Sequence, residues 1–156
     1  MASKTDFTPE EWKALAAGPL LAGMYVSLAQ PSWPVGVVKE GMAVVKEIIG
    51  ATGSSNELVA ALAQQVRASG PRDMPDVPAD REKARGELLS GVKKAMAAAG
   101  KSAADGEAYG QWVYAAAQKA AEAAKEGGFL GFGGTVVSEA ETAALAELKT
   151  ALGVKV

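Results

Sequence analysis

The reactive side chains of this chain are few in kind, because its 156 residues include no histidine and no cysteine. Histidine is the usual general base and the commonest metal ligand, while cysteine supplies thiolate nucleophiles, disulfides and most structural zinc sites. Only lysine, tyrosine, serine and carboxylates remain for chemistry at a reacting centre. No two carboxylates stand out as a general acid and base. The sequence therefore predicts a protein that is not an enzyme and holds no metal or cofactor.

Three aspartates lie near one another at a proline-rich loop, at about residues 70–79. Asp73 and Asp76 fall inside this loop and Asp80 follows it. Their spacing differs from that of an EF-hand loop, and neighbouring arginines provide ordinary counter-charges. We therefore expect a solvated loop whose aspartates cap the next helix, and not a site for a hard cation.

A glycine-rich loop at residues 127–137 is the second candidate, and it begins Gly-Gly-Phe-Leu-Gly-Phe-Gly-Gly. Glycine at this density indicates that the backbone turns sharply or approaches another group closely. A phosphate-binding loop would place a lysine after its last spaced glycine, but here Gly134 and Thr135 follow. The next helix begins with Glu139 and Glu141, whose carboxylates would repel a phosphate. Phosphate binding is therefore not expected.

Three large apolar residues separate these glycines, namely Phe129, Leu130 and Phe132. Three interpretations stay open. The side chains plug one end of the fold, or they stay exposed and dock on a partner or a membrane surface, or the loop forms a lid over an apolar pocket. Docking predicts a non-enzymatic interaction or scaffold module, including one that self-associates. A lid predicts a carrier or sensor of a small apolar ligand or lipid.

Aromatic residues at helical spacing would supply the lining of such a pocket. Tyr25, Tyr109 and Trp112 are the candidates, and each tyrosine would add a polar group to an apolar wall. Aromatics at this spacing more often belong to a plain hydrophobic core. These three residues, with the three apolar residues of the glycine-rich loop, are the expected partner- or ligand-binding positions.

The elements that position these residues are expected to be helices. Alanine, the best helix former, is abundant, and aromatic residues make up only 6% of the chain. A chain of this length forms one domain with a sizeable core, so we expect residues 1–156 to form a single all-α bundle of about six helices.

The first helix carries the clearest local signal. Thr8 and Glu11 form a capping box, and Phe7 and Trp12 occupy the two positions of a hydrophobic staple. The dipeptide Gly18-Pro19 should kink or split this helix, because proline lacks an amide donor.

The second helix is expected at about residues 34–49. Lysines and glutamates form one stripe along it, and the helix is apolar over roughly two-thirds of its circumference. Such a helix must be covered on several sides, so we expect it to be the central helix of the bundle. The remaining helices are expected at residues 54–69, 80–99, 102–126 and 138–152. Ser54 should cap the first of these, and the charged first half of the second should project into water. The third should pack through alanines on one face, and the last should stop at Gly153.

Net charge and hydropathy limit the partners. The formal net charge is −2 and the pI about 5.3, so there is no basic field for nucleic acid or anionic lipid. No charged residue occurs from Ala14 to Val38, which approaches transmembrane length, but several prolines interrupt this stretch. We expect a buried helical hairpin there and no membrane span. The N-terminus lacks the apolar run of a signal peptide, and we expect a cytoplasmic protein.

Overall fold

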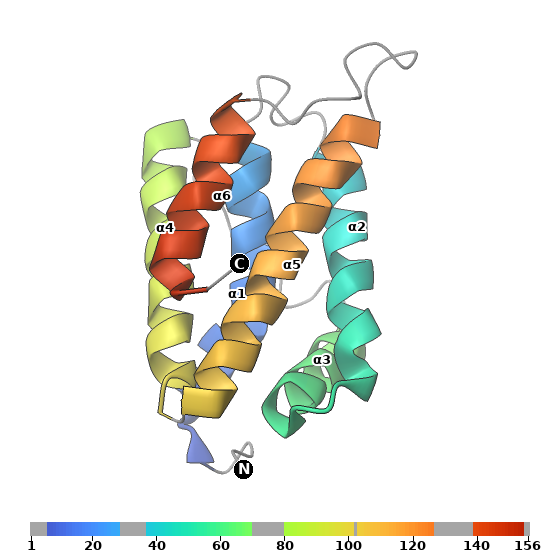
Figure 1. The fold of residues 1–156 in the computed structure, drawn as a ribbon, viewed down its shortest axis with the longest axis vertical. Helices are drawn as coiled ribbons and strands as arrows, with labels where there is room; N and C mark the ends of the chain where they lie inside the picture. Colours follow the sequence, from blue (N-terminus) through green and yellow to red (C-terminus); the bar gives the residue numbers. More distant parts are fainter. Residues whose placement is uncertain (1–5, 29–36, 70–79, 102, 127–138, 155–156) are drawn as a thin grey trace.

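The computed structural model describes residues 6–28, 37–69, 80–101, 103–126 and 139–154, and the regular elements in these ranges are all helical. They are α1 (Pro9–Leu28), α2 (Val37–Gly50), the short 3₁₀ helix η2 (Ala51–Gly53), α3 (Glu57–Ser69), α4 (Arg81–Ala99), α5 (Ala103–Glu126) and α6 (Glu139–Leu152). Figure 1 shows α4, α1, α5 and α2 side by side, with α3 below α2 and α6 against α4 and α5. The predicted six-helix, all-α bundle is confirmed.

The beginning of α1 is fixed as the local signal predicts. Glu11 N–H donates to Thr8 Oγ1 at 3.1 Å, and Thr8 N–H donates to Glu11 Oε1 at 3.0 Å. The rings of Phe7 and Trp12 lie 6.0 Å apart. Lys101, in the turn between α4 and α5, adds a long-range tie, because its Nζ lies 2.8 Å from Glu11 Oε2 and 5.1 Å from the centre of the Phe7 ring. The helix start is therefore joined to a distant part of the chain.

The proline inside α1 does not split the helix, which runs from Pro9 to Leu28. Proline at position 19 has no N–H to donate to the carbonyl of Leu15, four residues earlier. The hydroxyl of Tyr109, on α5, donates to that carbonyl at 2.6 Å. A side chain from a neighbouring helix thus supplies the hydrogen bond that the α1 backbone lacks.

Three glycines lie where side chains of neighbouring helices approach the backbone closely. A Cβ placed on Gly18 would lie 2.0 Å from the Tyr109 hydroxyl, and one on Gly23 would lie 2.6 Å from a methyl of Val44 on α2. On the other side of α1, a Cβ on Gly91 of α4 would lie 2.7 Å from a methyl of Leu21. We call these contacts the glycine notches. They bring α5, α2 and α4 unusually close to α1, since real Cβ contacts are not this short.

The central helix of the bundle is α1, and this corrects the expectation for the helix at about residues 34–49. α1 packs against α2, α3, α4, α5 and α6, and most extensively against α4 and α5. α2 packs chiefly against α5, α1 and α3 and stands at the side of the bundle (Figure 1). The small residues of α1 allow neighbouring helices to approach from several sides. They indicate the central helix better than the apolar circumference of α2 does. Residues 34–36 lie outside the described part of the chain.

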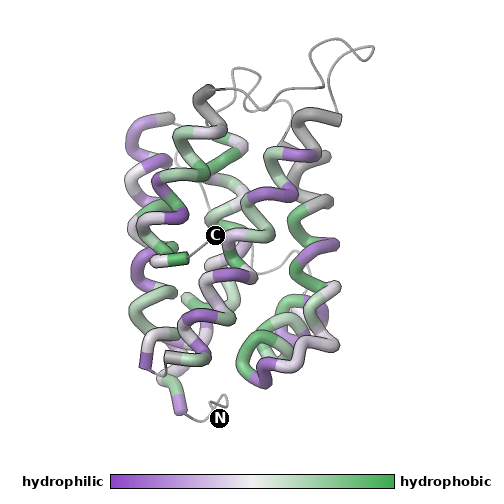
Figure 2. Tube along the Cα trace, in the orientation of Figure 1, coloured by the Kyte–Doolittle hydropathy of each residue, from purple (hydrophilic) through white to green (hydrophobic). Residues whose placement is uncertain are grey.

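α5 packs through its small side chains, as its sequence predicts. Its fully buried alanines are Ala116, Ala117 and Ala120, with Ala121 only 1% exposed. Gln111, Gln118 and Glu122 are exposed on the other side of the helix. In the coloured parts of α4 and α5 in Figure 2, hydrophilic residues recur along each helix. This is the pattern of helices that bury one side only.

Two further helix starts are capped by side chains. Asp80 caps α4 by accepting from the amide of Lys83 at 3.0 Å. Asn56 caps α3 by accepting from the amide of Val59 at 3.0 Å, so the expected cap at Ser54 is wrong by two residues. Ser54 accepts from the Asn56 amide instead.

The end of α6 is closed as predicted by Gly153. This residue has φ +64°, a left-handed conformation that favours glycine. Its amide donates to the carbonyl of Thr150 at 3.2 Å, and the amide of Val154 donates to the carbonyl of Lys149 at 3.2 Å. This pair of bonds is the Schellman arrangement.

Within the described ranges, no helix combines the length and the apolar character that crossing a bilayer would require.

Candidate functional site

Several helix ends lie at one end of the bundle. α1 and α5 finish there, at Leu28 and Glu126, while α2, α4 and α6 begin there, at Val37, Arg81 and Glu139 (Figure 1). Residues 29–36 connect α1 to α2 and residues 127–138 connect α5 to α6, and neither connection contains an ionisable side chain, whereas the segment that leads into α4, residues 70–79, contains an arginine and two aspartates. We call this place the connection end. Two uncharged segments, separate in the sequence, are therefore attached to the same end of the fold.

Phe129, Leu130 and Phe132 belong to the second of these connections and lie outside the described residues. The proline-rich loop at about 70–79, with Asp73 and Asp76, also lies outside them. The choice among plug, lid and docking surface therefore stays a prediction, and so do the three binding positions in the glycine-rich loop.

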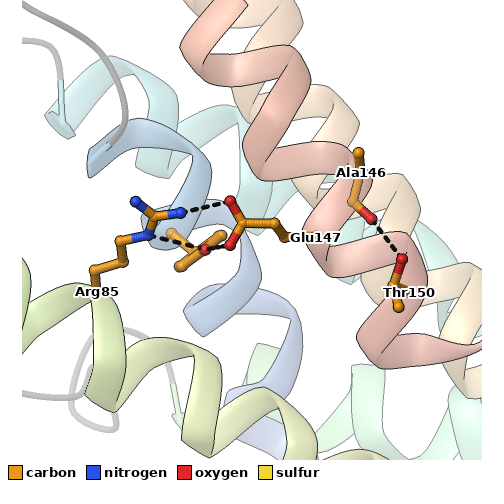
Figure 3. Close-up of polar contacts among 5 residues, drawn as sticks. Arg85, Ala146, Glu147 and Thr150 are labelled. Atoms are coloured by element: carbon orange, nitrogen blue, oxygen red, sulfur yellow. Dashed lines mark hydrogen bonds and ion pairs between the residues drawn. The ribbon is translucent and has the colours of Figure 1, made fainter.

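Tyr25 takes part in a polar cluster where α1, α4 and α6 meet. Its ring is buried, and its hydroxyl donates to Glu147 Oε2 on α6. Arg85 of α4 donates from Nε to the Tyr25 hydroxyl at 3.1 Å and from Nη2 to Glu147 Oε1. Figure 3 shows the Arg85 guanidinium and the Glu147 carboxylate turned toward one another between their helices. The guanidinium carbon also lies 5.7 Å from the centre of the Tyr25 ring. These three side chains are the α6 clamp.

The electrostatics of the α6 clamp keep each group in its usual charge state at neutral pH. The hydrogen bond from Tyr25, and then that from Arg85, lower the pKa of Glu147 below its ordinary value of 4.5, against the opposing effect of burial. Burial raises the pKa of Tyr25 above 10, and its bond to Glu147 raises it further. The hydrogen bond to Tyr25, and then that to Glu147, raise the pKa of Arg85. The Tyr25 hydroxyl therefore stays a neutral donor between the Glu147 carboxylate and the Arg85 guanidinium.

Tyr109 and Trp112 lie together elsewhere, on the buried side of α5. Their ring centres are 5.9 Å apart and the rings meet edge to face at 70°. The Tyr109 hydroxyl is engaged by the Leu15 carbonyl, and complete burial raises its pKa far above 10, so it remains a donor. The indole N–H of Trp112 is buried without a hydrogen-bond partner among the described residues, as is that of Trp12.

The three aromatic candidates therefore do not form one polar-lined pocket. Tyr25 contacts α4 and α6, whereas Tyr109 contacts Leu15 of α1, about three turns earlier, roughly 15 Å along the helix at 1.5 Å per residue. Both hydroxyls donate hydrogen bonds to other groups of the bundle. Among residues that the structure describes, no group of three or more carboxylates gathers where a metal ion could bind.

Sequence reasoning missed the contacts that are made by Arg85, Glu147 and Lys101. Arg85 lies in the highly charged first half of α4, which was expected to project into water. Most of that half is exposed, but Ala84 is completely buried and Arg85 reaches the Tyr25 hydroxyl. The partners in the α6 clamp are 60 and 122 residues apart, so no local pattern points to them.

The α6 clamp makes stability depend on pH. We expect Glu147→Gln to lower the free energy of unfolding by about 0.5–1 kcal/mol at neutral pH, because the side chains of Arg85 and Glu147 are 57% and 39% exposed. The pKa of Glu147 is lower in the folded state than in the unfolded state, so the ionised carboxylate stabilises the fold at pH values above the unfolded pKa. This contribution to the free energy of unfolding is lost as the pH falls through the folded pKa. Urea unfolding at neutral pH and at about pH 3 should therefore show the difference from wild type shrinking in acid.

Tyr25→Phe is the control for this measurement, since it removes the largest cause of the Glu147 shift. In that background the pH-dependent part of the Glu147→Gln effect should be smaller. An unchanged pH dependence would contradict the role given to the tyrosine.

The fold and these contacts define an all-α bundle with a polar clamp on its last helix. No protein-family model, curated protein or solved structure matches the chain.

Proposed function

We propose that this protein is a non-enzymatic interaction module that binds a protein partner through apolar residues at the connection end. The observation that carries the proposal is the placement of the helix ends to which residues 29–36 and 127–138 are attached. Both uncharged connections join helix ends that lie at the same end of the bundle, and together they contain Trp33, Phe129, Leu130 and Phe132. Aromatic residues are enriched, and charged residues depleted, at the centres of protein interfaces.

The framework that holds these connections supports the same function. Binding residues commonly belong to loops that a rigid scaffold positions. Here the scaffold is α1 with α5 and α2, joined by the glycine notches at Gly18 and Gly23 and by the bond from Tyr109 to Leu15. Such a scaffold would hold the helix ends to which the two connections are attached in fixed positions while a partner binds.

The residue types of the chain support a binding role over catalysis. Histidine and cysteine are absent from the sequence. The hydroxyls of Tyr25 and Tyr109 form hydrogen bonds that join helices to one another. We place the module in the cytoplasm as part of the proposal, on the ground that its sequence has no cysteine for disulfides.

A photo-crosslinking amino acid at Phe132 tests the proposal in cells that express the protein. We expect a discrete covalent adduct with one protein, identified by mass spectrometry. The purified partner should then bind wild type and should bind the Phe129→Ser/Phe132→Ser variant at least about ten-fold more weakly, equivalent to about 1.4 kcal/mol.

The matched control is the same crosslinker at Glu107, an exposed residue near the start of α5, at the opposite end of the bundle. This position should not give the adduct. Equal adducts at both positions, or no adduct at Phe132 and unchanged association of the double variant, would refute the proposal. An apolar small molecule that copurifies with wild type and is absent from the double variant would replace it with a carrier function.

A further inference from the structure

Methionine supplies all of the oxidisable sulfur in this chain, which contains five methionines and no cysteine. A hydroperoxide oxidises a methionine thioether to a sulfoxide, which changes a flexible apolar side chain into a polar one. The two methionines whose side chains the structure describes are Met24 on α1 and Met96 on α4, and both are partly buried against the core. Met96 lies where three helices come together.

The Met96 side chain lies over two glycines of α5 that are about one helical turn apart. A Cβ placed on Gly106 would lie 3.6 Å from Met96 Cε, and one placed on Gly110 would lie 3.6 Å from Met96 Sδ. The same position on Gly110 lies 3.3 Å from the Leu152 carbonyl oxygen and 3.3 Å from a methyl of Val154. The thioether of α4 and the closing turn of α6 therefore both approach the α5 backbone at this glycine. We call these five residues the methionine junction.

An oxygen added to the Met96 sulfur has two directions to point, and each weakens the methionine junction. Directed at α5, the oxygen meets helical backbone, where the Gly110 amide already takes part in the hydrogen bonding of the helix. It would then be a polar atom without a donor. Directed at solvent, the oxygen moves the thioether away from the two glycines and removes its contact with them.

We propose that Met96 is a reversible oxidation site, and that its sulfoxide loosens the packing of α4 and of the end of α6 on α5. A sulfur lone pair attacks one oxygen of a hydroperoxide, and the S–O bond forms as the O–O bond breaks. The departing hydroxide or alkoxide takes up a proton and leaves as water or an alcohol. Sulfur loses two electrons and the peroxide gains two. Methionine sulfoxide reductases return both epimers of the sulfoxide to the thioether.

The position of Met96 in the fold suits this role. Its side chain is partly exposed, which gives a peroxide access to it in the folded protein. It also lies at the end of the bundle where α4 finishes and α5 begins, opposite the connection end (Figure 1). The proposal is therefore independent of the proposed function.

Treatment of the folded, full-length protein with hydrogen peroxide tests the proposal. Peptide mass mapping should find one added oxygen at Met96. The oxidised protein should unfold at a Tm lower by roughly 3–10 °C, the range expected when a buried polar group lacks a partner in a domain of this size. Hydrogen exchange should accelerate about ten-fold or more at the amides of Gly153 and Val154, which close α6. Methionine sulfoxide reductases should reverse both changes.

Three variants make the result specific to this sulfur. Met96→Leu keeps an apolar side chain of similar volume, so its Tm should stay close to that of wild type and should no longer respond to peroxide. Met24→Leu is the matched control and should keep the full response. Met96→Gln replaces the thioether with a polar amide and should lower the Tm without peroxide.

Three results would overturn the proposal. The first is an oxidised Met96 with unchanged Tm and unchanged exchange at the end of α6. The second is a Met96 that stays a thioether in the folded protein under conditions that oxidise Met24. The third is a Met96→Leu variant that loses as much stability in peroxide as wild type does.

Discussion

Replacing Gly18 with alanine should lower the free energy of unfolding by about 2–3 kcal/mol, although alanine favours helix over glycine by up to about 1 kcal/mol. The added Cβ would lie 2.0 Å from the Tyr109 hydroxyl and 3.1 Å from its Cζ. Tyr109 is completely buried, so it has little room to move. Moving it also breaks its bond to the Leu15 carbonyl. Urea and thermal unfolding measure the effect, with a fall in Tm of roughly 4–12 °C for a domain of this size.

Two companion variants make this result specific. Gly86, also within a helix, has open space where its Cβ would be, so Gly86→Ala should stabilise the protein by up to about 1 kcal/mol. In a Tyr109→Phe background the hydroxyl is gone, and the cost of Gly18→Ala should fall. If Gly18→Ala matched Gly86→Ala, the close approach of α5 to α1 would be refuted.

Replacing Tyr109 with phenylalanine alone should lower the free energy of unfolding by about 1–3 kcal/mol, the usual range when a buried polar group loses its partner. The group left behind is the Leu15 carbonyl, because Pro19 has no amide to donate to it. Chemical denaturation of the purified variant measures the loss.

Pro19→Ala provides the matching rescue. The alanine amide can donate to the Leu15 carbonyl within α1, so the combined variant Pro19→Ala/Tyr109→Phe should lose less stability than the sum of the single variants. Strict additivity of the two free-energy changes would show that tyrosine does not act through this carbonyl.

Local sequence patterns predicted much of the fold because their partners are only a few residues apart. The capping box of Thr8 and Glu11, the staple of Phe7 and Trp12, and the glycine that closes α6 are all contacts within one or two turns. Helix periodicity also separated the buried and exposed sides of α5. These signals establish six helices and their limits to within a few residues.

The arrangement of those helices depended on contacts that no local pattern contains. The Leu15 carbonyl and the Tyr109 hydroxyl are 94 residues apart, and neither the freed carbonyl nor its donor is recognisable until the helices are packed. The central position was assigned to α2 from its apolar circumference, whereas the glycines of α1 decide how closely its neighbours approach. Of the candidate site, Tyr25 was named from its type, but Arg85 and Glu147 required the folded chain.

The glycine notches have a consequence for motion. Each one pairs α1 with a different neighbour: Tyr109 of α5 lies against Gly18 of α1, Val44 of α2 lies against Gly23 of α1, and Leu21 of α1 lies against Gly91 of α4. Sliding α5, α2 or α4 along α1 by even one residue would drive that side chain into backbone or into a neighbouring side chain. The shapes of these three contacts therefore fix the register of α2, α4 and α5 against α1.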